Sequence, residues 1–166
     1  MNMKVKIKKS ASPAKRSEAK LDGLHLLRQC QAQRGLKYSR KREAITAYFL
    51  EADRHFTVEQ LYREMRNTHP HIGYSTVYRT LKLLADCGIA AVHHFEEDEA
   101  RFEPAHREPD HDHLVCVHCG RIIEFTHQGI DRFQEEVAQK HDFAVQSREL
   151  QLYGICKECK KRKKER

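Results

Sequence analysis

Two groups of metal-binding residue types meet between positions 111 and 119 of this 166-residue chain. The first three positions are His-Asp-His, and the last four are Cys-Val-His-Cys. Imidazole nitrogen and carboxylate oxygen suit borderline and hard divalent ions, whereas thiolates suit zinc. The stretch therefore predicts a mixed nitrogen and oxygen site next to a thiolate site.

A second Cys-x-x-Cys pair near the C-terminal end completes a four-thiolate set. The set comprises Cys116, Cys119, Cys156 and Cys159. Two residues between paired cysteines let a tight turn aim both sulfurs at one ion, and four thiolates close a tetrahedron as in structural zinc sites. Redox chemistry of the dithiols is the main alternative, and an inert reduced set is the other. We expect Cys30 to be an ordinary packed thiol.

The nitrogen and oxygen site has fewer constraints, because twelve histidines allow many combinations. One residue separates His111 from His113, so both point to one side of an extended segment, and Glu124 follows on the predicted neighbouring strand. If Glu103 and His55 complete the shell, one ion ties the two halves of the chain together, as a metal switch requires. A surface histidine cluster without metal is the alternative.

The composition leaves room for one ordinary domain or two small ones. Hydrophobic residues make up 39% of the chain and Trp is absent, so a small second domain needs a staple such as a metal. No apolar run approaches the ~18 residues of a membrane span, and no apolar stretch follows the basic N-terminus as in a secretory signal. We expect a cytoplasmic protein, in which cysteine pairs at Cys-x-x-Cys spacing bind metal or do redox chemistry more often than they form lasting disulfides.

The net charge of +7 is unevenly distributed. Residues 1–20 and 160–166 are strongly basic, residues 21–92 are moderately basic, and residues 93–159 hold seven basic and fifteen acidic side chains. A basic first half suits a polyanion, and an acidic second half suits cations. Ordinary solvated surface charge is the alternative.

The first half is predicted to be a winged helix-turn-helix domain over residues 21–103, after a disordered basic arm at 1–20. Ser39 and the Thr57/Gln60 capping box mark two helix starts, and Gly88 marks a helix end. The expected helices cover residues 21–33, 39–52, from 57 onward, and 75–87. Two short strands, 89–95 and 100–103, form the wing around an acidic turn.

The helix at 75–87 has one apolar and one polar face. Its polar side carries the DNA-binding candidates Ser75, Thr76, Tyr78, Arg79 and Lys82. Hydroxyl groups and arginine suit a major groove, because arginine can bind guanine O6 and N7 in a bidentate manner. A solvated polar face is the alternative.

The second half is predicted to be a small zinc-stapled α+β domain, so the overall fold class is α+β. A linker at 104–110 leads to a metal-binding dimerisation domain at 111–159, and a basic tail follows at 160–166. Its expected elements are strands at 113–117, 121–125 and 143–153 and a helix at 128–140. An exposed strand edge or the Ile130 face is the expected dimer contact.

Several motifs together resemble the ferric uptake regulator family over roughly residues 24–159. The motifs are Gly35-Leu36-Lys37, the run from Tyr74 to Leu81, the run from His111 to Gly120, and the run from Leu152 to Cys156. The resemblance implies a winged-helix domain, a dimerisation domain and a homodimer that binds A·T-rich palindromes of double-stranded DNA. It also implies a metal co-repressor of iron-acquisition genes.

The resemblance also assigns roles to individual residues. His55, Glu103, His111, His113 and Glu124 match the family's sensory site, and the four cysteines match its structural zinc site. Tyr78 and Arg79 match recognition-helix contacts, and Lys37 matches a lysine that enters a narrow minor groove. The chain departs from the family at a third site. Asp112 and Asp131 are present, but Asp110 and Arg148 replace histidines, and a guanidinium cannot ligate metal.

The identity of the regulatory metal depends on ligand type and availability, since intrinsic affinity favours zinc over iron. The family's zinc-sensing branch tends to use a thiolate where this chain has Glu103, and its peroxide-sensing branch uses Asp where this chain has Glu103 and Glu124. Two glutamates favour an Fe(II)-dependent repressor. A manganese, zinc or peroxide sensor is the alternative.

Two other classes of function are compatible with parts of the sequence. In a non-heme metalloenzyme, His111, His113 and a carboxylate would form a facial triad, but five candidate ligands leave little open coordination. We therefore expect no catalytic residues and no enzyme. The other class is a zinc-stapled interaction module without a DNA role.

Overall fold

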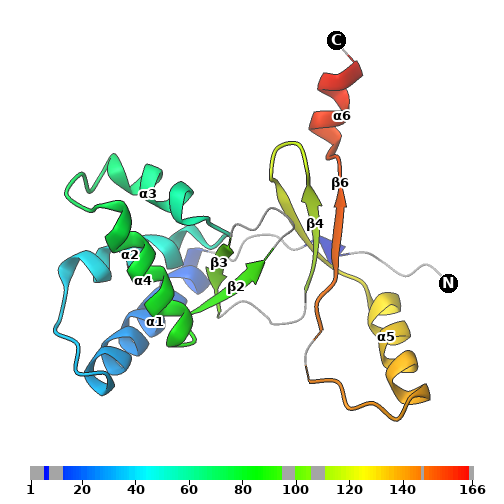
Figure 1. Ribbon diagram of the computed structural model, residues 1–166, viewed down its shortest axis with the longest axis horizontal. Helices are drawn as coiled ribbons and strands as arrows, with labels where there is room; N and C mark the ends of the chain where they lie inside the picture. Colours follow the sequence, from blue (N-terminus) through cyan, green and yellow to red (C-terminus); the bar gives the residue numbers. More distant parts are fainter. Residues whose placement is uncertain (1–5, 8–12, 95–99, 106–110, 147, 165–166) are drawn as a thin grey trace. The chain divides into compact units, whose positions relative to one another are not determined.

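The computed structural model describes residues 6–7, 13–94, 100–105, 111–146 and 148–164. The chain forms two compact units, Ser10–Arg107 and a second made of Met1–Lys9 with Glu108–Arg166. Helices and small sheets occur in an α+β arrangement, as predicted (Figure 1). Among the described residues, no helix is both long and apolar enough to cross a membrane.

The first unit contains four helices: α1 (Pro13–Gln33), α2 (Arg40–Ala52), α3 (Val58–Arg66) and α4 (Tyr74–Asp86). Two helix starts follow the predicted side-chain caps. Ser39 caps α2 by accepting a hydrogen bond from the Arg42 N–H. Thr57 and Gln60 form the reciprocal capping box of α3, with both hydrogen bonds at 3.1 Å. These caps satisfy backbone donors that the helices themselves leave open, which fixes where each helix begins.

The expectation of a disordered arm at 1–20 is wrong for the described part of that segment. The helix α1 already begins at Pro13, and β1 (Lys6–Ile7) pairs with β5 (Ile122–Thr126) within the second unit. Proline suits the first position of a helix, and the alanine, lysine and arginine residues that follow are good helix formers. A composition with few apolar residues therefore did not prevent helix formation here.

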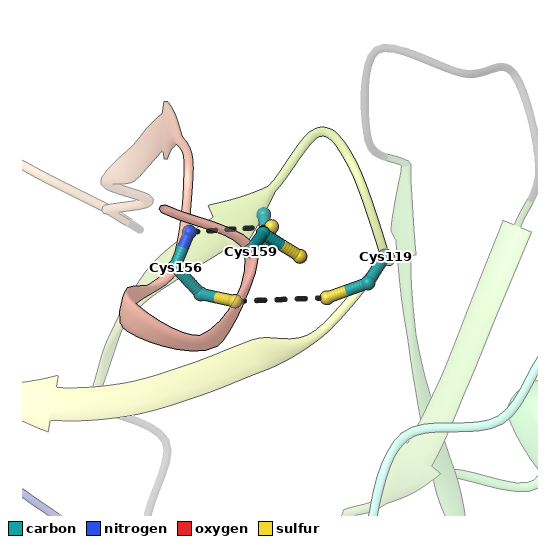
Figure 2. Close-up of side chains that lie close together, drawn as sticks. Cys119, Cys156 and Cys159 are labelled. Carbon is teal, nitrogen blue, oxygen red and sulfur yellow. Dashed lines mark hydrogen bonds between the residues drawn. The ribbon is translucent and has the colours of Figure 1, made fainter. Parts of the chain in front are cut away.

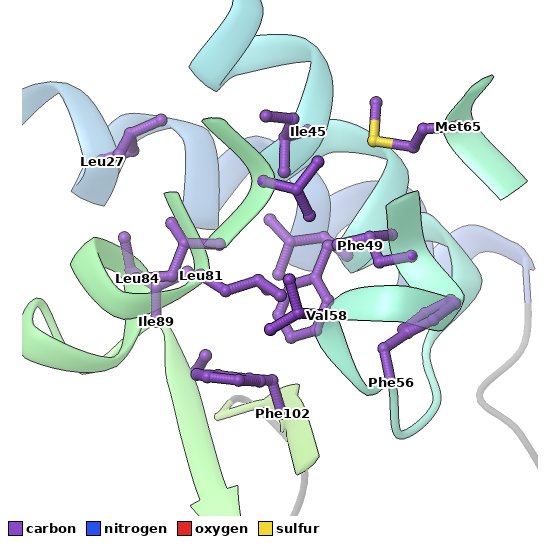
Figure 3. Close-up of a cluster of buried hydrophobic side chains, with 14 of the residues drawn as sticks. Leu27, Ile45, Phe49, Phe56, Val58, Met65, Leu81, Leu84, Ile89 and Phe102 are labelled. Carbon is purple, nitrogen blue, oxygen red and sulfur yellow. The ribbon is translucent and has the colours of Figure 1, made fainter. Parts of the chain in front are cut away.

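The core of the first unit lies between the helices and the wing. Phe49, Phe56 and Leu81 are fully buried there, and Phe102 reaches the same cluster from the wing (Figure 3). The helices α1 and α2 approach closely at Gly23, where an added Cβ would lie 2.4 Å from a side-chain carbon of Leu50. This packing fixes α4 by its buried face and leaves its other face exposed.

The wing consists of β2 (Ala90–His94) and β3 (Ala100–Pro104), which pair in an antiparallel manner. A backbone bridge between Phe56 and Phe102 joins the wing to the segment before α3. The predicted turn at 96–99 lies outside the described residues. So does most of the predicted linker at 104–110, whose first residue, Pro104, ends β3.

Cys30 is not an ordinary packed thiol, contrary to expectation. It forms a disulfide with Cys87, with the two Cα atoms 6.1 Å apart. Cys30 lies in the last turn of α1, and Cys87 is the C-cap residue of α4. The two cysteines are separated by 57 positions in the sequence, and no local motif indicated this pairing.

The second unit is built on a sheet with the order β1-β5-β4-β6. Its longer strands are β4 (Asp112–Cys116), β5 (Ile122–Thr126) and β6 (Gln151–Gly154), and its helices are α5 (Gln128–Lys140) and α6 (Lys157–Lys164). β4 pairs antiparallel to β5 and parallel to β6. The helix α5 has its predicted bounds, and the basic tail continues from β6 as the helix α6 (Figure 1).

The last strand is shorter than the predicted 143–153. The strand beside β4 spans Gln151–Gly154, and residues 143–146 and 148–150 have no regular secondary structure. Phe143 and Val145 in that segment are 68% and 49% exposed, so their apolar side chains find no cover within one chain. Alternating apolar residues predicted a strand here, but a strand also needs a partner to pair with.

Candidate metal sites and nucleic-acid surface

The four predicted zinc ligands come together at one end of the second unit's sheet. Cys116 ends β4, and Cys119 lies in the turn that follows. Cys156 lies just after β6, and Cys159 lies in α6. Because β4 and β6 are parallel neighbours with Cys116 paired to Gly154, both Cys-x-x-Cys pairs lie at the same end of the sheet.

The sulfur positions suit a tetrahedral ion. All four sulfurs lie within 4.8 Å of one another, and the Cys119 and Cys156 sulfurs are 3.8 Å apart (Figure 2). A zinc–sulfur bond of about 2.3 Å gives a tetrahedron edge of roughly 3.8 Å. The cluster therefore fits a structural zinc ion without rearrangement of these two ligands.

The thiol groups of the cluster differ in acidity. A hydrogen bond of 3.3 Å from the Cys156 backbone N–H lowers the pKa of Cys116 to about 6. Side-chain hydrogen bonding with Cys156 and then Cys119 raises the pKa of Cys159 to about 12. Closely spaced sulfurs cannot all carry negative charge unless a cation compensates it. Cys116 therefore forms a thiolate more easily than Cys159, which needs a bound metal to lose its proton.

The first unit presents a half-site of imidazole and carboxylate groups. Nε2 of His55 lies 3.1 Å from Oε2 of Glu103, and Nε2 of His93 lies 2.7 Å from Oε1 of the same carboxylate. The pairing of His55 with Glu103 was part of the predicted sensory set, whereas His93 was missed. A signal did exist: in the register of the wing, His93 is opposite Arg101, so it shares a face with Glu103 two residues further on.

The second unit presents a half-site of the same chemical kind. His113 on β4 is paired directly with Glu124 on β5. Nε2 of His111 lies 3.9 Å from Oε2 of Glu124, and the His111 and His113 rings are 4.8 Å apart between centroids. The predicted same-side arrangement of His111, His113 and Glu124 is thus present within this unit.

The residues of the predicted third site are only partly assembled. Nη1 of Arg148 lies 2.9 Å from Oδ1 of Asp131, so a cation already occupies the carboxylate that a metal would need. Asp112 is buried on β4, and Asp110 lies outside the described residues.

The helix α4 divides into a buried and an exposed face. Val77, Leu81 and Leu84 are fully buried, as the helical spacing predicted, and Thr80 joins them by donating a hydrogen bond to the Thr76 carbonyl. The exposed or half-exposed face carries all five predicted DNA-binding residues of the helix: Ser75, Thr76, Tyr78, Arg79 and Lys82. This face is continuous along the helix, as insertion into a groove requires.

Lys37 lies exposed in the loop between α1 and α2, and a polar network holds that loop in place. Tyr38 donates a hydrogen bond to Glu43, and the Arg28 guanidinium contacts the same carboxylate, each at 2.5 Å. Hydrogen bonding from Tyr38 and then from Arg28 lowers the pKa of Glu43. Arg42 donates to the Lys37 carbonyl at 3.2 Å. The backbone of Lys37 is therefore anchored while its ammonium group faces solvent.

Residues 33–153 match the model of the ferric uptake regulator family. The chain belongs to the ferric uptake regulator family. It is 38% identical over 133 residues to the ferric uptake regulation protein of Campylobacter jejuni, covering 79% of this chain and 84% of that protein. The predicted family membership is thereby confirmed.

Solved structures of the ferric uptake regulator family share the fold. The Helicobacter pylori ferric uptake regulator, described as having three functional metal binding sites, superposes with a TM-score of 0.79 at 31% identity, covering 85% of this chain and 93% of that one. A zinc-bound manganese uptake regulator superposes with a TM-score of 0.65 at 36% identity, covering 78% and 98%. As a member of the ferric uptake regulator family, this chain is a metal-responsive regulator, and members of the family are transcription regulators and not enzymes.

Proposed function

We propose that this protein is an Fe(II)-dependent repressor that binds A·T-rich palindromic DNA as a homodimer in the cytoplasm. The observation that carries the proposal is the presence of one half-site of matching chemistry on each unit. The DNA-binding unit offers His55 and Glu103, and the other unit offers His111, His113 and Glu124. One divalent ion that takes ligands from both half-sites would set the placement of the helix α4 relative to the dimerisation unit.

Iron is favoured because both half-sites consist of nitrogen and oxygen donors. The glutamates Glu103 and Glu124 each face a histidine, at 3.1 and 3.9 Å. Imidazole and carboxylate ligands suit Fe(II) and Mn(II), whereas ligand shells that contain thiolate select zinc. His93 adds a third donor to the half-site of the DNA-binding unit, 2.7 Å from Glu103.

The four-cysteine cluster is proposed to hold a structural zinc ion. Its ligands come from β4, the following turn, the segment just after β6 and α6. One ion would therefore hold these elements of the second unit together. The sulfur spacing of 3.8 Å supports this assignment. A bound zinc would supply folding free energy that the thin core of this unit lacks.

The homodimer is proposed to form on the second unit, through α5 and the segment before β6. Phe133 and Val137 on α5 are 66% and 59% exposed, and Phe143 is 68% exposed. Such side chains gain about 25 cal/mol for each Å² of apolar surface removed from water. β6 is also the edge strand of the described sheet, and edge strands are common places for pairing with another chain.

DNA recognition is proposed to use the exposed face of α4 in the major groove and Lys37 in the minor groove. Arg79 and Tyr78 lie on that face, and Tyr78 is 45% exposed. Changing Arg79 to Ala should weaken specific binding by about 1–3 kcal/mol and relax base preference at one position. An unchanged footprint would remove Arg79 from base recognition.

The direct test is a binding titration on an A·T-rich palindrome with anaerobically purified, zinc-loaded protein. Fe(II) should induce binding, and removal of the weakly held metal with a chelator should reverse it while the zinc content stays at one per chain. Binding that persists without the second metal would contradict the proposal. The His113→Ala variant is the matched control, because it should keep zinc and lose the Fe(II) response.

A manganese-responsive regulator is the second candidate. It is favoured by the 36% identity to a manganese uptake regulator and by the overlapping ligand preferences of the two ions. Titration with Fe(II), Mn(II) and Zn(II) in parallel separates the candidates, because the metal that induces binding at the lowest free concentration identifies the sensor. A response to peroxide only in the Fe(II)-loaded protein would identify the peroxide-sensing alternative.

A further inference from the structure

The DNA-binding unit contains a cysteine pair that the proposed metal sites do not use. Cys30 and Cys87 are joined as a disulfide with a Cα separation of 6.1 Å, inside the usual range of about 4.4–6.8 Å for disulfides. Both residues are half-buried, so the bond lies close enough to the surface for small reagents to reach it. Neither cysteine belongs to the Cys116 cluster at the end of the other unit's sheet.

The pair joins the ends of two helices, α1 and α4. The backbone of α1 packs mainly on α2, and α4 packs on α2 and α3. Besides the disulfide, Arg34 donates to the Asp86 carbonyl at 3.1 Å and lies 3.4 Å from its carboxylate. Because these contacts hold the two ends together, the thiols of the reduced form stay within reach of each other.

We infer that Cys30 and Cys87 form a reversible redox site, oxidised by hydroperoxides, that locks the end of α1 to the end of the helix α4. In the first step one thiolate attacks the peroxide, an S–O bond forms, the O–O bond breaks, and the alcohol or water takes the proton. In the second step the other thiol attacks the sulfenic acid, the S–S bond forms, and water leaves. Two thiols and one hydroperoxide thus give one disulfide, one alcohol or water and one water. A dithiol reductant restores both thiols and is itself oxidised to a disulfide.

The consequence for DNA binding rests on the proposed function. Lys37 follows α1 after Gly35, whose φ of +65° turns the chain sharply. Tyr78 and Arg79 lie on α4, whose end carries Cys87. The disulfide therefore fixes the spacing between the minor-groove lysine and the major-groove face. Oxidation should strengthen DNA binding. The disulfide already restricts the motion of the two contact regions, so less conformational entropy is lost when DNA binds.

The test uses the full-length, zinc-loaded protein, reduced and then desalted without oxygen. Hydrogen peroxide is added, free thiols are alkylated, and peptides are mapped by mass spectrometry together with the zinc content. We expect a Cys30–Cys87 linked peptide to accumulate while zinc remains at one per chain. Alkylation of both Cys30 and Cys87 after peroxide treatment would overturn the inference, as would zinc release that precedes their linkage.

Thermal unfolding and DNA binding give the second readout. The transition of the DNA-binding unit should rise by about 10 °C on oxidation, because the bond closes a loop with a sequence separation of 57 residues. The affinity for the palindrome should rise several-fold. This comparison needs only the wild-type protein. Equal melting temperatures and equal DNA affinities of its oxidised and reduced forms would overturn the inference.

Two matched variants separate this site from the rest of the protein. The double change Cys30→Ser and Cys87→Ser should abolish the effect of peroxide on melting while metal-dependent DNA binding survives. The change Arg34→Ala leaves both thiols in place and should slow disulfide formation without preventing it. If the double variant still gains thermal stability from peroxide, the stabilising oxidation lies elsewhere and the inference fails. Loss of all metal response in reduced wild-type protein would instead contradict the proposed function.

Discussion

The guanidinium of Arg148 lies 2.9 Å from the carboxylate of Asp131 on α5. The resemblance to the family predicts that Asp131 belongs to a third metal site and that Arg148 stands where the family has a histidine. If Asp131 is a metal ligand, the ion pair places a fixed positive charge where the metal would bind. Both side chains are about one-third exposed, so the pair contributes little to stability, but it competes with any cation for the carboxylate.

The Arg148→His variant should therefore gain metal. Removal of the guanidinium frees Asp131, and the imidazole supplies a nitrogen ligand. We expect one additional divalent ion per chain at saturating Mn(II) or Zn(II), measured by elemental analysis after removal of weakly bound metal. The matched control is Arg148→Lys, which keeps the positive charge and should bind no more than wild type. Equal metal content in Arg148→His and wild type would show that other residues of the site are missing.

Replacement of His93 should weaken the response to the regulatory metal. Nε2 of His93 lies 2.7 Å from the Glu103 carboxylate, so it either ligates the ion or orients a carboxylate that does; loss of such a partner typically costs about 10–100-fold in metal affinity. The absorption spectrum of the Co(II)-loaded protein should change in His93→Ala. The neighbouring exposed His94 is the control, because His94→Ala should leave spectrum and affinity unchanged. An unchanged His93→Ala spectrum would place this side chain outside the metal's environment.

Zinc binding to the four-cysteine cluster should depend on pH in a direction that the thiol acidities set. The Cys116 pKa of about 6 lies below its ordinary value, so the stabilising thiolate is lost as pH falls through about 6. The Cys159 pKa of about 12 lies above its ordinary value. The protonated Cys159 thiol therefore stabilises the folded state at pH values below its ordinary pKa of 9.0. This contribution is lost as the pH rises toward about 12. At neutral pH, Cys159 thus stays protonated until zinc arrives, and zinc binding must displace its proton.

We therefore expect the apparent zinc affinity to rise from pH 6 to pH 9, measured by competition with a chelator of known protonation behaviour. Calorimetry in buffers of different ionisation enthalpy should detect proton release at pH 7. A Cys116→Ser variant should lose zinc and the fold of the second unit. Zinc affinity that is independent of pH would contradict the assignment of these thiols as ligands.

Two neighbouring residues on α4 separate stability from DNA binding. Leu81 is fully buried in the core, whereas Lys82 is exposed. Leu81→Ala should lower the free energy of unfolding by about 2–5 kcal/mol, because it leaves a cavity. Lys82→Ala should change stability by less than about 0.5 kcal/mol. It should also lower the salt dependence of DNA binding by about one unit of slope.

Denaturant unfolding and binding at several salt concentrations measure both effects. A destabilised Lys82→Ala protein would mean that this side chain packs against the unit. A salt dependence equal to wild type would remove Lys82 from phosphate contact.

The sequence by itself determined the local features of this protein. Ser39, Thr57 and Gln60 specify helix starts, because their side chains bond to backbone groups within three residues. The spacing of Val77, Leu81 and Leu84 specifies the buried face of α4, because residues at helical spacing lie on one side of the helix. The two Cys-x-x-Cys pairs and the His-Asp-His run were identified because each ligand pair lies within a few residues in the chain.

Tertiary structure alone decided the relationships between distant residues. Cys30 meets Cys87 because α1 and α4 end side by side, and His93 meets Glu103 because of the wing's register. Arg148 meets Asp131 because the segment before β6 passes α5. The predicted strand at 143–153 shortens to β6, since alternation of apolar residues cannot supply a pairing partner. Such contacts depend on packing of whole elements, and no short stretch of sequence encodes them.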